Sequence, residues 1–508
     1  MRRDPSPHQD TADPPAQAHL ALCHNAAVHP LALGAIVVLG VLSAGALLVF
    51  LLAGHGAVPR GRTARLARIG RLWAAISASW LGANLRRAFA SRERRVRIDE
   101  ARRRADAERV AQTMGQMKGA FMKLGQMLSF VSEDIPAEMR SALAALQAEA
   151  PPMDFPLVRD VAERELGQPL ERAFAAFDTT PLAAASIGQV HRARLASGEE
   201  VVVKIQYPGV AEAIRADLAN VAVLYSLMGL AYPALDPRPV VDELRARTLE
   251  ELDYAHEAEN QRMFAELYAG HPFIRVPHVF PAHSTGRVLT MEYVKGKRFA
   301  DVLALDDARR QRVGEILYRF VFGSIHRHGV FNGDPHPGNY LLDEEDRVVF
   351  LDYGCVKRFP AEMVTGWRSL VVAHLEGHRE RFRAQLLHLG FIRPDTTLPT
   401  DLLYDYFEYF YRPIHADEEF TFSREYNAAS LKLVFAPDGR FAGLTKKTNM
   451  PPDFVFVNRI QWGVYSILGQ LEARANFHRI QRELFFDEPP STELGRIDEA
   501  WRARRVGS

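Results

Sequence analysis

Cysteine is scarce in this chain of 508 residues: only Cys23 and Cys355 occur, far apart and in no spacing typical of metal ligands. A disulfide framework and a cysteine-ligated zinc site are therefore not supported. Hydrophobic residues make up 47% of the chain and charged residues 25%. This composition excludes a wholly disordered, a collagen-like and a multi-span membrane protein. The length suggests about two to four units of 100–200 residues each.

Charged residues are absent from a run of 23 residues between Leu31 and Ala53. A helix of this length spans about 34 Å at about 1.5 Å per residue, enough to cross a hydrocarbon core of about 30 Å. A buried core helix would normally keep a polar face, and a cleaved signal peptide normally has an apolar core of only about 7–15 residues. The run therefore predicts one transmembrane helix.

Acidic residues are missing from the segment that follows, where none occurs between Arg60 and Glu93. Residues 54–104 contain fourteen Arg and three acidic residues, a local charge balance of +11. Positively charged flanks stay on the cytoplasmic side, so we expect a single-pass inner-membrane protein with its large C-terminal part in the cytoplasm, or in the matrix if the membrane is mitochondrial. A basic segment directly after a membrane span favours anionic lipid headgroups as its partner, and no nucleic acid is expected.

The rest of the chain changes from strand-like to helical patterns. Short β-branched runs at 201–205 and 287–294 predict strands around a long helical stretch at about 239–268. The pattern from 300 to 486 is helical, except for a predicted short strand pair at 346–354. A small β-rich lobe followed by a larger helical lobe predicts a bilobal α+β domain.

Lys204 stands inside the apolar strand VVVKI, where an unpaired ammonium would be costly to bury. An outward-facing edge-strand lysine is the simpler alternative. An acidic helical segment follows, in which Glu250, Asp253 and Glu257 would share one side while Glu251 lies about 100° round. One helix could therefore pair with two different lysines.

Two further motifs carry carboxylates at informative spacings. Asp334 and Asn339 are separated by four residues, the spacing of the kinase catalytic loop, in which the Asp accepts a hydroxyl proton and the Asn holds magnesium. Asp352 ends an apolar strand and is followed by Tyr353 and Gly354, which is the form of the metal-binding Asp-Phe-Gly motif of kinases. Lysine, helix glutamate and these two motifs, in this order, predict nucleotide and Mg²⁺ binding.

A metallohydrolase site is the alternative from another chemical class, with His326, His328, Asp334 and His336 as ligands. Their spacing lacks the tight H-x-H-x-D-H form. This alternative would also leave the strand motifs around it unexplained.

A glycine-rich phosphate loop is absent before Lys204. Its place is taken by the segment PLAAASIGQVHRA, which has Ala183, Ala184, Ala185 and Ser186 where glycines would be expected. Each added methyl group restricts how closely backbone N–H groups approach phosphates. Phosphate could still be contacted by Ser186, Gly188 and Gln189. This feature argues against an ordinary protein kinase.

Jointly, these segments resemble the UbiB family of atypical kinase-like proteins, the group associated with ubiquinone (coenzyme Q) biosynthesis. The resemblance covers about residues 105–480 and rests on KLGQ at 123–126, AAASIGQVH at 183–191, VVVKIQYPG at 201–209, ELDYAHEA at 251–258, DPHPGN at 334–339 and LDYG at 351–354. Two departures are Asn332, where many relatives carry His, and Tyr353 in place of Phe.

The resemblance implies a role for each matching residue. Lys204 would pair with Glu257 and contact the nucleotide phosphates, and Asp334 would stand at the position of the catalytic base. The other implied groups are the magnesium ligands Asn339 and Asp352, the Ala-rich loop Ala183–Ser186 that favours ADP over productive ATP transfer, and the adenine-reading hinge from Glu292 to Val294. A helical KxGQ extension with Lys123, Gly125 and Gln126 would cover the peptide groove, with Lys123 tied to Glu251 and Asp253.

Composition and resemblance together give an expected domain plan and an expected function. The expected units are a disordered tail 1–30, a transmembrane helix 31–53, a basic segment 54–104, the KxGQ extension 105–160, a kinase-like N-lobe 161–298, a C-lobe 299–486 and a polar tail 487–508. The expected function is that of a membrane-anchored Mg²⁺-dependent ATPase, using ATP and ADP, that acts on prenyl-lipid precursors of ubiquinone or on the enzymes that modify them. A phosphotransferase acting on a small molecule or a protein, and a nucleotide-binding pseudokinase scaffold, are the alternatives.

Overall fold

The computed structural model describes residues 153–185, 187–218, 248–332, 335–435 and 451–506, with isolated positions at 94, 242, 245, 246, 441, 444, 448 and 449. The predicted transmembrane helix at 31–53 and the KxGQ residues Lys123, Gly125 and Gln126 lie outside the described residues. Among the described helices, none combines the length and the apolar character that a membrane crossing requires.

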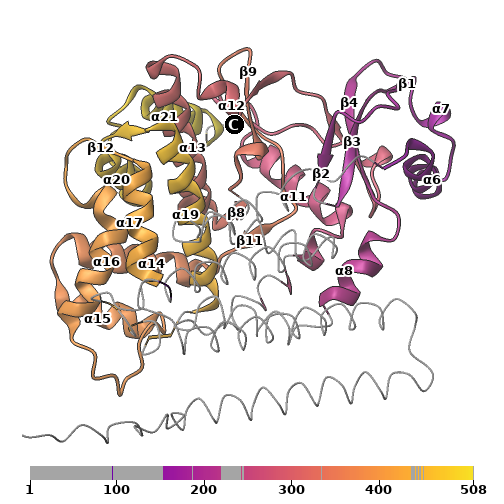
Figure 1. The fold of residues 1–508 in the computed structure, drawn as a ribbon. Helices are drawn as coiled ribbons and strands as arrows, with labels where there is room; N and C mark the ends of the chain where they lie inside the picture. Colours follow the sequence, from indigo (N-terminus) through magenta and orange to yellow (C-terminus); the bar gives the residue numbers. More distant parts are fainter. Residues whose placement is uncertain are drawn as a thin grey trace, which may run out of the picture. The chain divides into compact units, whose positions relative to one another are not determined.

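The first lobe is built on an antiparallel sheet (Figure 1). Its strands are β1 (Ala176–Phe177), β2 (Ala183–Ala185), β3 (Gly188–Arg194), β4 (Glu200–Gln206) and β6 (Val288–Glu292). The strand order is β1-β3-β4-β6, and β2 pairs with the first residues of β3, from Gly188 to Val190. The predicted strands at 201–205 and 287–294 are thereby confirmed as the central β4 and its neighbour β6. Lys204 therefore lies on a central strand, opposite Val190 and Leu289.

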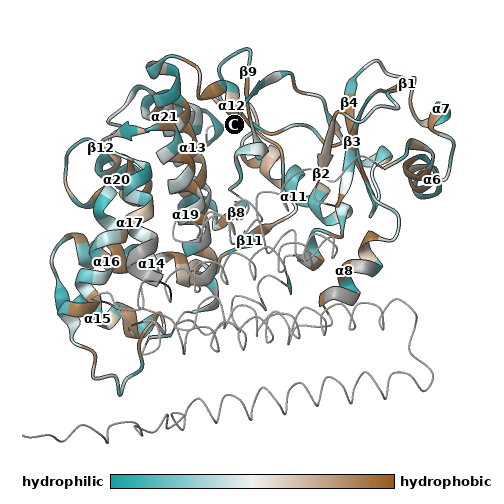
Figure 2. Ribbon diagram, viewed as in Figure 1, coloured by the Kyte–Doolittle hydropathy of each residue, from teal (hydrophilic) through white to brown (hydrophobic). Residues whose placement is uncertain are grey.

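Two helices cover one face of this sheet. In α6 (Phe155–Leu166) the residues Val158, Val161 and Ala162 are buried in one cluster with Val201 and Val203 of β4, and α7 (Leu170–Ala173) adds its own apolar residues. Figure 2 shows hydrophobic and hydrophilic residues on the same helix α6. The expected boundary at residue 161 falls inside α6, whose apolar face packs against the sheet.

The helix that carries Glu257 is α11 (Tyr254–Leu267). Asp253 is its N-cap and accepts hydrogen bonds from the backbone N–H groups of Ala255 and His256. The predicted continuous helix at about 239–268 is wrong at this point, because residues 251–253 form a turn. A short carboxylate that satisfies two free N–H groups favours a helix start, which places Asp253 before the helix rather than along its side.

A second sheet has the order β5-β10-β9-β7, with strands β5 (Ile274–Arg275), β7 (Gly296–Arg298), β9 (Tyr340–Asp343) and β10 (Val348–Phe350). Of the strand pair predicted at 346–354, one strand is present as β10, whereas its partner β9 lies before that range. The two strands form a hairpin that turns at Asp346, which has a positive φ. The small pairs β8 (Val330–Asn332) with β11 (Val356–Arg358), and β12 (Phe420–Thr421) with β13 (Arg474–Ala475), complete the described strands.

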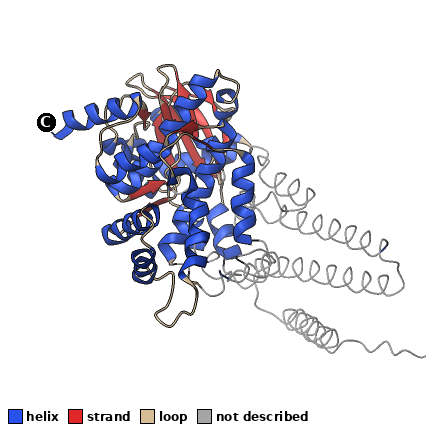
Figure 3. Ribbon diagram, turned by 90° about the vertical axis from the view of Figure 1, so that its left-hand side faces the viewer, coloured by secondary structure: helices blue, strands red, loops and turns tan. Residues whose placement is uncertain are grey.

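Helices make up most of the second lobe, as Figure 3 shows in blue. They are α12 (Phe299–Val302), α13 (Asp307–His328), α14 (Ala361–Leu375), α15 (Arg379–His388), α16 (Thr400–His415), α17 (Arg424–Phe435), α19 (Pro452–Leu471) and α20 (Phe477–Phe486). Other described helical segments are α8 (Val210–Leu218), η1 (Pro281–His283) and η2 (Pro337–Asn339). One large apolar cluster joins these helices to the inner side of the second sheet. The predicted bilobal α+β architecture is confirmed.

Within the expected polar tail at 487–508, residues Glu493–Val506 form the helix α21. Trp501 is buried, its ring lies parallel to Tyr268 at 6.3 Å, and its Nε1 donates to the carbonyl of Ala269. Asp498 is buried and accepts a hydrogen bond from Arg327 on α13. Few apolar residues are enough here, because the ion pairs of Asp498 and the aromatic contacts of Trp501 with Tyr268 and His271 hold the helix.

Two glycines of α13 test the packing of the second lobe. A Cβ atom on Gly314 would lie 2.7 Å from the Cβ of Ala473, whereas a Cβ on Gly323 would meet nothing closer than Leu484 Cδ2 at 3.7 Å. Glycine costs a helix interior about 1 kcal/mol relative to alanine. We therefore expect Gly323→Ala to stabilise the protein by up to about 1 kcal/mol and Gly314→Ala to destabilise it by about 1–3 kcal/mol. Urea denaturation of both variants measures this, and equal effects would contradict the described helix contact.

Candidate nucleotide site

The centre of the candidate site is an ion pair between β4 and α11. Lys204 Nζ lies 2.9 Å from both carboxylate oxygens of Glu257, which belongs to the first turn of α11. The exposed fraction is 13% for the lysine side chain and 2% for the glutamate side chain. The simpler alternative of an outward-facing lysine is excluded, because both groups are withdrawn from water and each satisfies the other.

Asp352 approaches the same ammonium group from the second lobe. Its Oδ2 lies 3.9 Å from Lys204 Nζ, and its Oδ1 accepts a hydrogen bond of 2.9 Å from the backbone N–H of Gly354. About one third of the Asp352 side chain is exposed. The carboxylate is thus fixed at one oxygen by its own turn and directs the other toward Lys204.

Two asparagines hold the turn around Asp352 from both sides. Asn260 lies on α11 one turn after Glu257, and its Nδ2 donates to the carbonyl of Tyr353 at 3.3 Å. The side chain of Asn332 on β8 donates to the carbonyl of Asp352. The sequence marked Asn332 only as a departure from the family pattern, and it gave no role to Asn260. A signal for Asn260 was available, because it lies on the same side of α11 as Glu257.

The loop that carries the second predicted metal ligand is attached to the same turn. Asn339 ends η2, and its carbonyl accepts a hydrogen bond from the N–H of Leu351, next to Asp352. His336 stabilises this loop by accepting from the N–H of Gly338 at Nδ1. Asp334, the predicted catalytic base, lies outside the described residues.

The Ala-rich segment forms an extended hairpin. Ala183, Ala184 and Ala185 make up β2, paired with β3 up to Gly188, while Ser186 lies outside the described residues. A Cβ atom on Gly188 would stand 2.2 Å from the carbonyl oxygen of Ile205. Only glycine fits at this crossing. The sequence had suggested Gly188 only as a phosphate contact.

The predicted hinge follows β6. The N–H of Glu292 donates to the carbonyl of His278, and the N–H of Tyr293 donates to the carbonyl of Glu200. The Glu292 carboxylate accepts from Arg275 at 2.5 Å. Val294 is buried at the end of this segment. Two of the three hinge N–H groups are therefore already used inside the protein.

Electrostatics at the ion pair follow from its burial. Burial raises the pKa of Glu257 to about 7, against the opposing effect of the Lys204 charge. Burial by itself would lower the pKa of Lys204, but the carboxylates of Glu257 and Asp352 outweigh it and raise that pKa well above its usual range. The ring of Tyr254 lies under the ammonium at 4.8 Å and closes the pair off from water. The lysine is thus a fixed cation, whereas the glutamate titrates near neutral pH.

The predicted partners of the KxGQ lysine are only partly placed. Asp253 uses Oδ1 to cap α11, and a Cβ on Gly354 would lie 3.6 Å from Cγ of Glu251. Glu251 is thus close to the Asp352 turn. The pairing of either residue with Lys123 stays a prediction, because Lys123 lies outside the described residues.

The histidines of the alternative metallohydrolase site do not converge. His326 is buried against Trp367 and Phe485, and burial lowers its pKa to about 3. His328 lies two residues further on α13 and approaches Tyr268 instead, because side chains two positions apart on a helix point to different sides. Among the described residues, no group of three or more His, Cys, Asp or Glu side chains with converging ligand atoms contains His326, His328 or His336.

Comparisons with known proteins agree with this geometry. Residues 145–386 match the model of the ABC1 atypical kinase-like domain. The solved complex of Rv3197 with erythromycin from Mycobacterium tuberculosis is 32% identical, covers 75% of this chain and 97% of its own, and superposes with a TM-score of 0.56. The chain belongs to the ABC1 atypical kinase-like family.

Curated relatives of this family include the atypical kinase COQ8 of Saccharomyces cerevisiae mitochondria, a UbiB member, which is 31% identical over 57% of this chain and 58% of its own length. The chloroplast protein Activity of BC1 complex kinase 8 of Arabidopsis thaliana is 32% identical over 58% of this chain and 40% of its own length. The chain thus matches about half the length of these curated relatives. The resemblance to the UbiB family is confirmed.

The buried carboxyl of Glu257 predicts a pH-dependent stability. An acid with a pKa of about 7 in the fold and an ordinary value of 4.5 takes up a proton on folding between these two values. Its contribution to the free energy of unfolding therefore falls as the pH rises from about 5 to 7, by at most about 1.4 kcal/mol per pH unit, and is constant above that range.

Urea denaturation of the wild type and Glu257→Gln at several pH values measures this contribution as their difference. Glu171→Gln, at an exposed position, is the control for a general charge effect. A difference that does not change with pH, or that rises with pH, would show that the carboxylate stays ionised throughout.

Proposed function

We propose that this protein is a membrane-anchored, Mg²⁺-dependent ATPase of the ABC1 family that supports ubiquinone biosynthesis. The observation that carries the proposal is the buried Lys204–Glu257 pair, with the Asp352 carboxylate 3.9 Å from the same ammonium. A fixed cation next to an oxygen ligand suits a phosphate chain bridged to a hard metal ion.

The donor set fits such a group. Asn339 and Asp352 supply an amide oxygen and a carboxylate oxygen, which are the ligand types that Mg²⁺ prefers. Their two segments are linked by a hydrogen bond that the N–H of Leu351 donates to the carbonyl of Asn339. Bound Mg²⁺ would neutralise charge that develops on the terminal phosphate. Lys204 would orient the α- and β-phosphates, Glu257 would hold Lys204 in place, and Asp334 would accept a proton from the attacking hydroxyl or water.

The adenine end of the nucleotide would lie at the hinge. The N–H groups of Glu292 and Tyr293 are engaged within the protein, so we assign the adenine contact to the backbone of Val294. The Ala-rich strand Ala183–Ala185, with Ser186, would cover the phosphates. Its methyl groups restrict close approach of the backbone, which favours ADP binding over productive transfer of the ATP phosphate.

Two alternatives are distinguished by these same residues. A pseudokinase scaffold would not need two metal ligands and a base, which favours turnover. A KxGQ segment with Lys123, Gly125 and Gln126 over the peptide groove would disfavour protein substrates. We therefore place prenyl-lipid intermediates of ubiquinone, or the enzymes that modify them, as the partners of the site, with anionic lipid headgroups at the arginines of residues 54–104.

A phosphate-release assay tests the proposed activity. We expect Mg²⁺-dependent release of phosphate from ATP by the purified protein, stimulated by liposomes, and loss of both release and Mg²⁺-nucleotide binding in Asp352→Asn, because one charged ligand of a hard cation is removed. Asp160→Asn, which alters an exposed carboxylate on α6, is the matched control. Release that is unchanged in Asp352→Asn would remove Asp352 from the metal site, and nucleotide binding without release in the wild type would favour the scaffold.

The orientation in the membrane is a separate prediction. Residues 31–53 should cross once, with residues 60–508 in the compartment that holds ATP, because seven arginines from Arg60 to Arg87 resist transfer across the bilayer. Reporter fusions at each end and protease treatment of intact spheroplasts measure this. Digestion of the kinase-like lobes from the outer face would contradict both the orientation and the ATPase proposal.

A further inference from the structure

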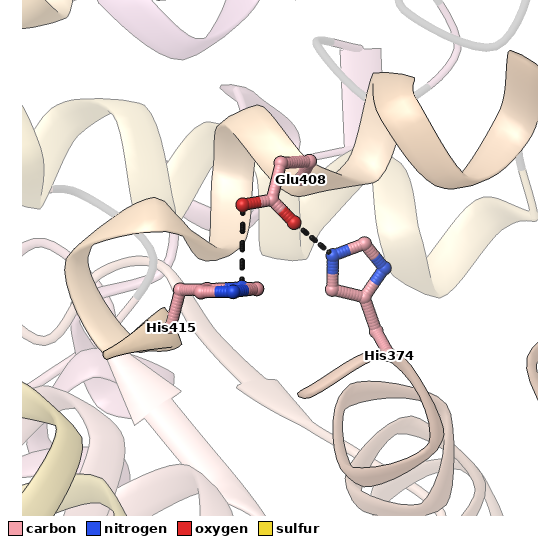
Figure 4. A group of neighbouring side chains, drawn as sticks. All are labelled: His374, Glu408 and His415. Carbon is pink, nitrogen blue, oxygen red and sulfur yellow. Dashed lines mark hydrogen bonds and ion pairs between the residues drawn. The ribbon is translucent and has the colours of Figure 1, made fainter. Parts of the chain in front are cut away.

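A second polar cluster lies in the helical part of the second lobe and takes no part in the nucleotide site. His374 of α14 and two residues of α16, Glu408 and His415, direct their polar atoms toward one another (Figure 4). Glu408 Oε2 lies 2.8 Å from His374 Nε2, and Oε1 lies 3.2 Å from His415 Nδ1. One ligand atom from each residue lies within 4.8 Å of the other two.

The helices fix this convergence. Glu408 and His415 are seven residues apart, which places them on the same side of α16, two turns from each other. His374 reaches them from the last turn of α14, where its ring stacks on Tyr404 at 3.9 Å. The hydroxyl of Tyr404 donates to the carbonyl of the same His374 and so fixes the backbone as well. The donor atoms are thus held by packing rather than by chance contact on a mobile surface.

The chemistry of the three donors is that of a zinc site. Two imidazole nitrogens and one carboxylate are a common set of protein ligands for Zn²⁺, which binds each at about 2.0–2.2 Å. His374 is fully buried, and burial lowers its pKa, which favours the neutral imidazole that a metal requires over the charged form. Side chains of His415 and Glu408 are 42% and 38% exposed, so an ion and a water ligand can enter from solvent.

Without a metal, the cluster is chemically incomplete. His374 Nδ1 is buried and has no hydrogen-bond partner among the described residues, whereas the Glu408 carboxylate accepts from Nε2 and so favours the tautomer with the proton on Nε2. A bound cation would take the place of that proton at Nε2, and the ring would then carry its proton on Nδ1. Nearby charge is nearly balanced, because Arg379 pairs with Asp401 at 2.9 Å and His378 with Glu376 at 3.6 Å.

We propose that His374, Glu408 and His415 bind one Zn²⁺ ion, which links α14 to α16 and leaves a fourth position open to water. The two proposed sites should select different metals, because imidazole nitrogens favour Zn²⁺, whereas the oxygen donors of Asn339 and Asp352 favour Mg²⁺. The site is independent of the proposed nucleotide site, since it shares no residue with it.

Zinc titration of the purified, metal-stripped protein tests the proposal. We expect one Zn²⁺ per chain by calorimetry and elemental analysis, a raised melting temperature, and a tetrahedral absorption band when Co²⁺ replaces Zn²⁺. His415→Gln should weaken zinc binding by at least about tenfold. Because His415 is largely exposed, this variant should fold like the wild type and keep its melting temperature in the absence of metal.

His378→Gln is the matched control, because it removes an exposed histidine just after the end of α14 and leaves all three donors in place. Glu408→Gln is a second test that keeps the side-chain shape. The proposal would be overturned if the wild type bound no zinc. It would also be overturned if the wild type and His415→Gln bound zinc with equal affinity, because the zinc would then be held by histidines elsewhere in the chain. Loss of binding in His415→Gln and Glu408→Gln but not in His378→Gln would support it.

Discussion

The structure around the candidate site depends on one buried ion pair. Withdrawing the Lys204 ammonium and the Glu257 carboxylate from water costs several kcal/mol per ion, and this cost is offset only if the two groups meet in good geometry. That requirement fixes the register of β4, because a slip by one residue would turn Lys204 to the other face of the sheet. It also fixes where α11 begins, since Glu257 must lie in the first turn after the Asp253 cap.

The same helix joins the two lobes. α11 gives Glu257 to the first lobe, whereas its Phe264 belongs to the large apolar core of the second lobe and contacts Tyr353 at 5.0 Å. Asn260, between them, holds the carbonyl of Tyr353. One helix therefore sets the position of the lysine partner and of the Asp352 turn at once, which explains how two lobes with separate cores present their charges at one point.

Much of this arrangement could be predicted from the sequence, because the chemistry of single residues demanded it. A lysine in an apolar strand needs an acidic partner, and the carboxylate motifs at Asn339 and Asp352 have spacings that few other functions use. The strands β4, β6 and β10 and the bilobal plan followed from β-branched runs and helical periodicity. These features are local, and local patterns are what a sequence displays directly.

The features that the sequence did not reveal depend on contacts between distant segments. The acidic run around Glu251 has helical spacing, but capping by Asp253 interrupts it, and a cap competes with a helix continuation only in the folded chain. The helix α21 has few apolar residues, and its place is decided by Trp501 and Asp498, whose partners lie more than 170 positions earlier. Gly188 looked like a phosphate contact until the carbonyl of Ile205 was placed beside it.

The attachment of α21 has a consequence for how α11 can move. Tyr268, just after the end of α11, is held by Ser324 at 2.7 Å and by the parallel ring of Trp501, while Asp253 and Tyr254 hold the opposite end. A helix anchored at both ends cannot rotate outward as a rigid lever without breaking buried contacts at one of them. Any motion of α11 that separates Lys204 from Glu257 would therefore also cost the contacts of Tyr268 or the cap at Asp253.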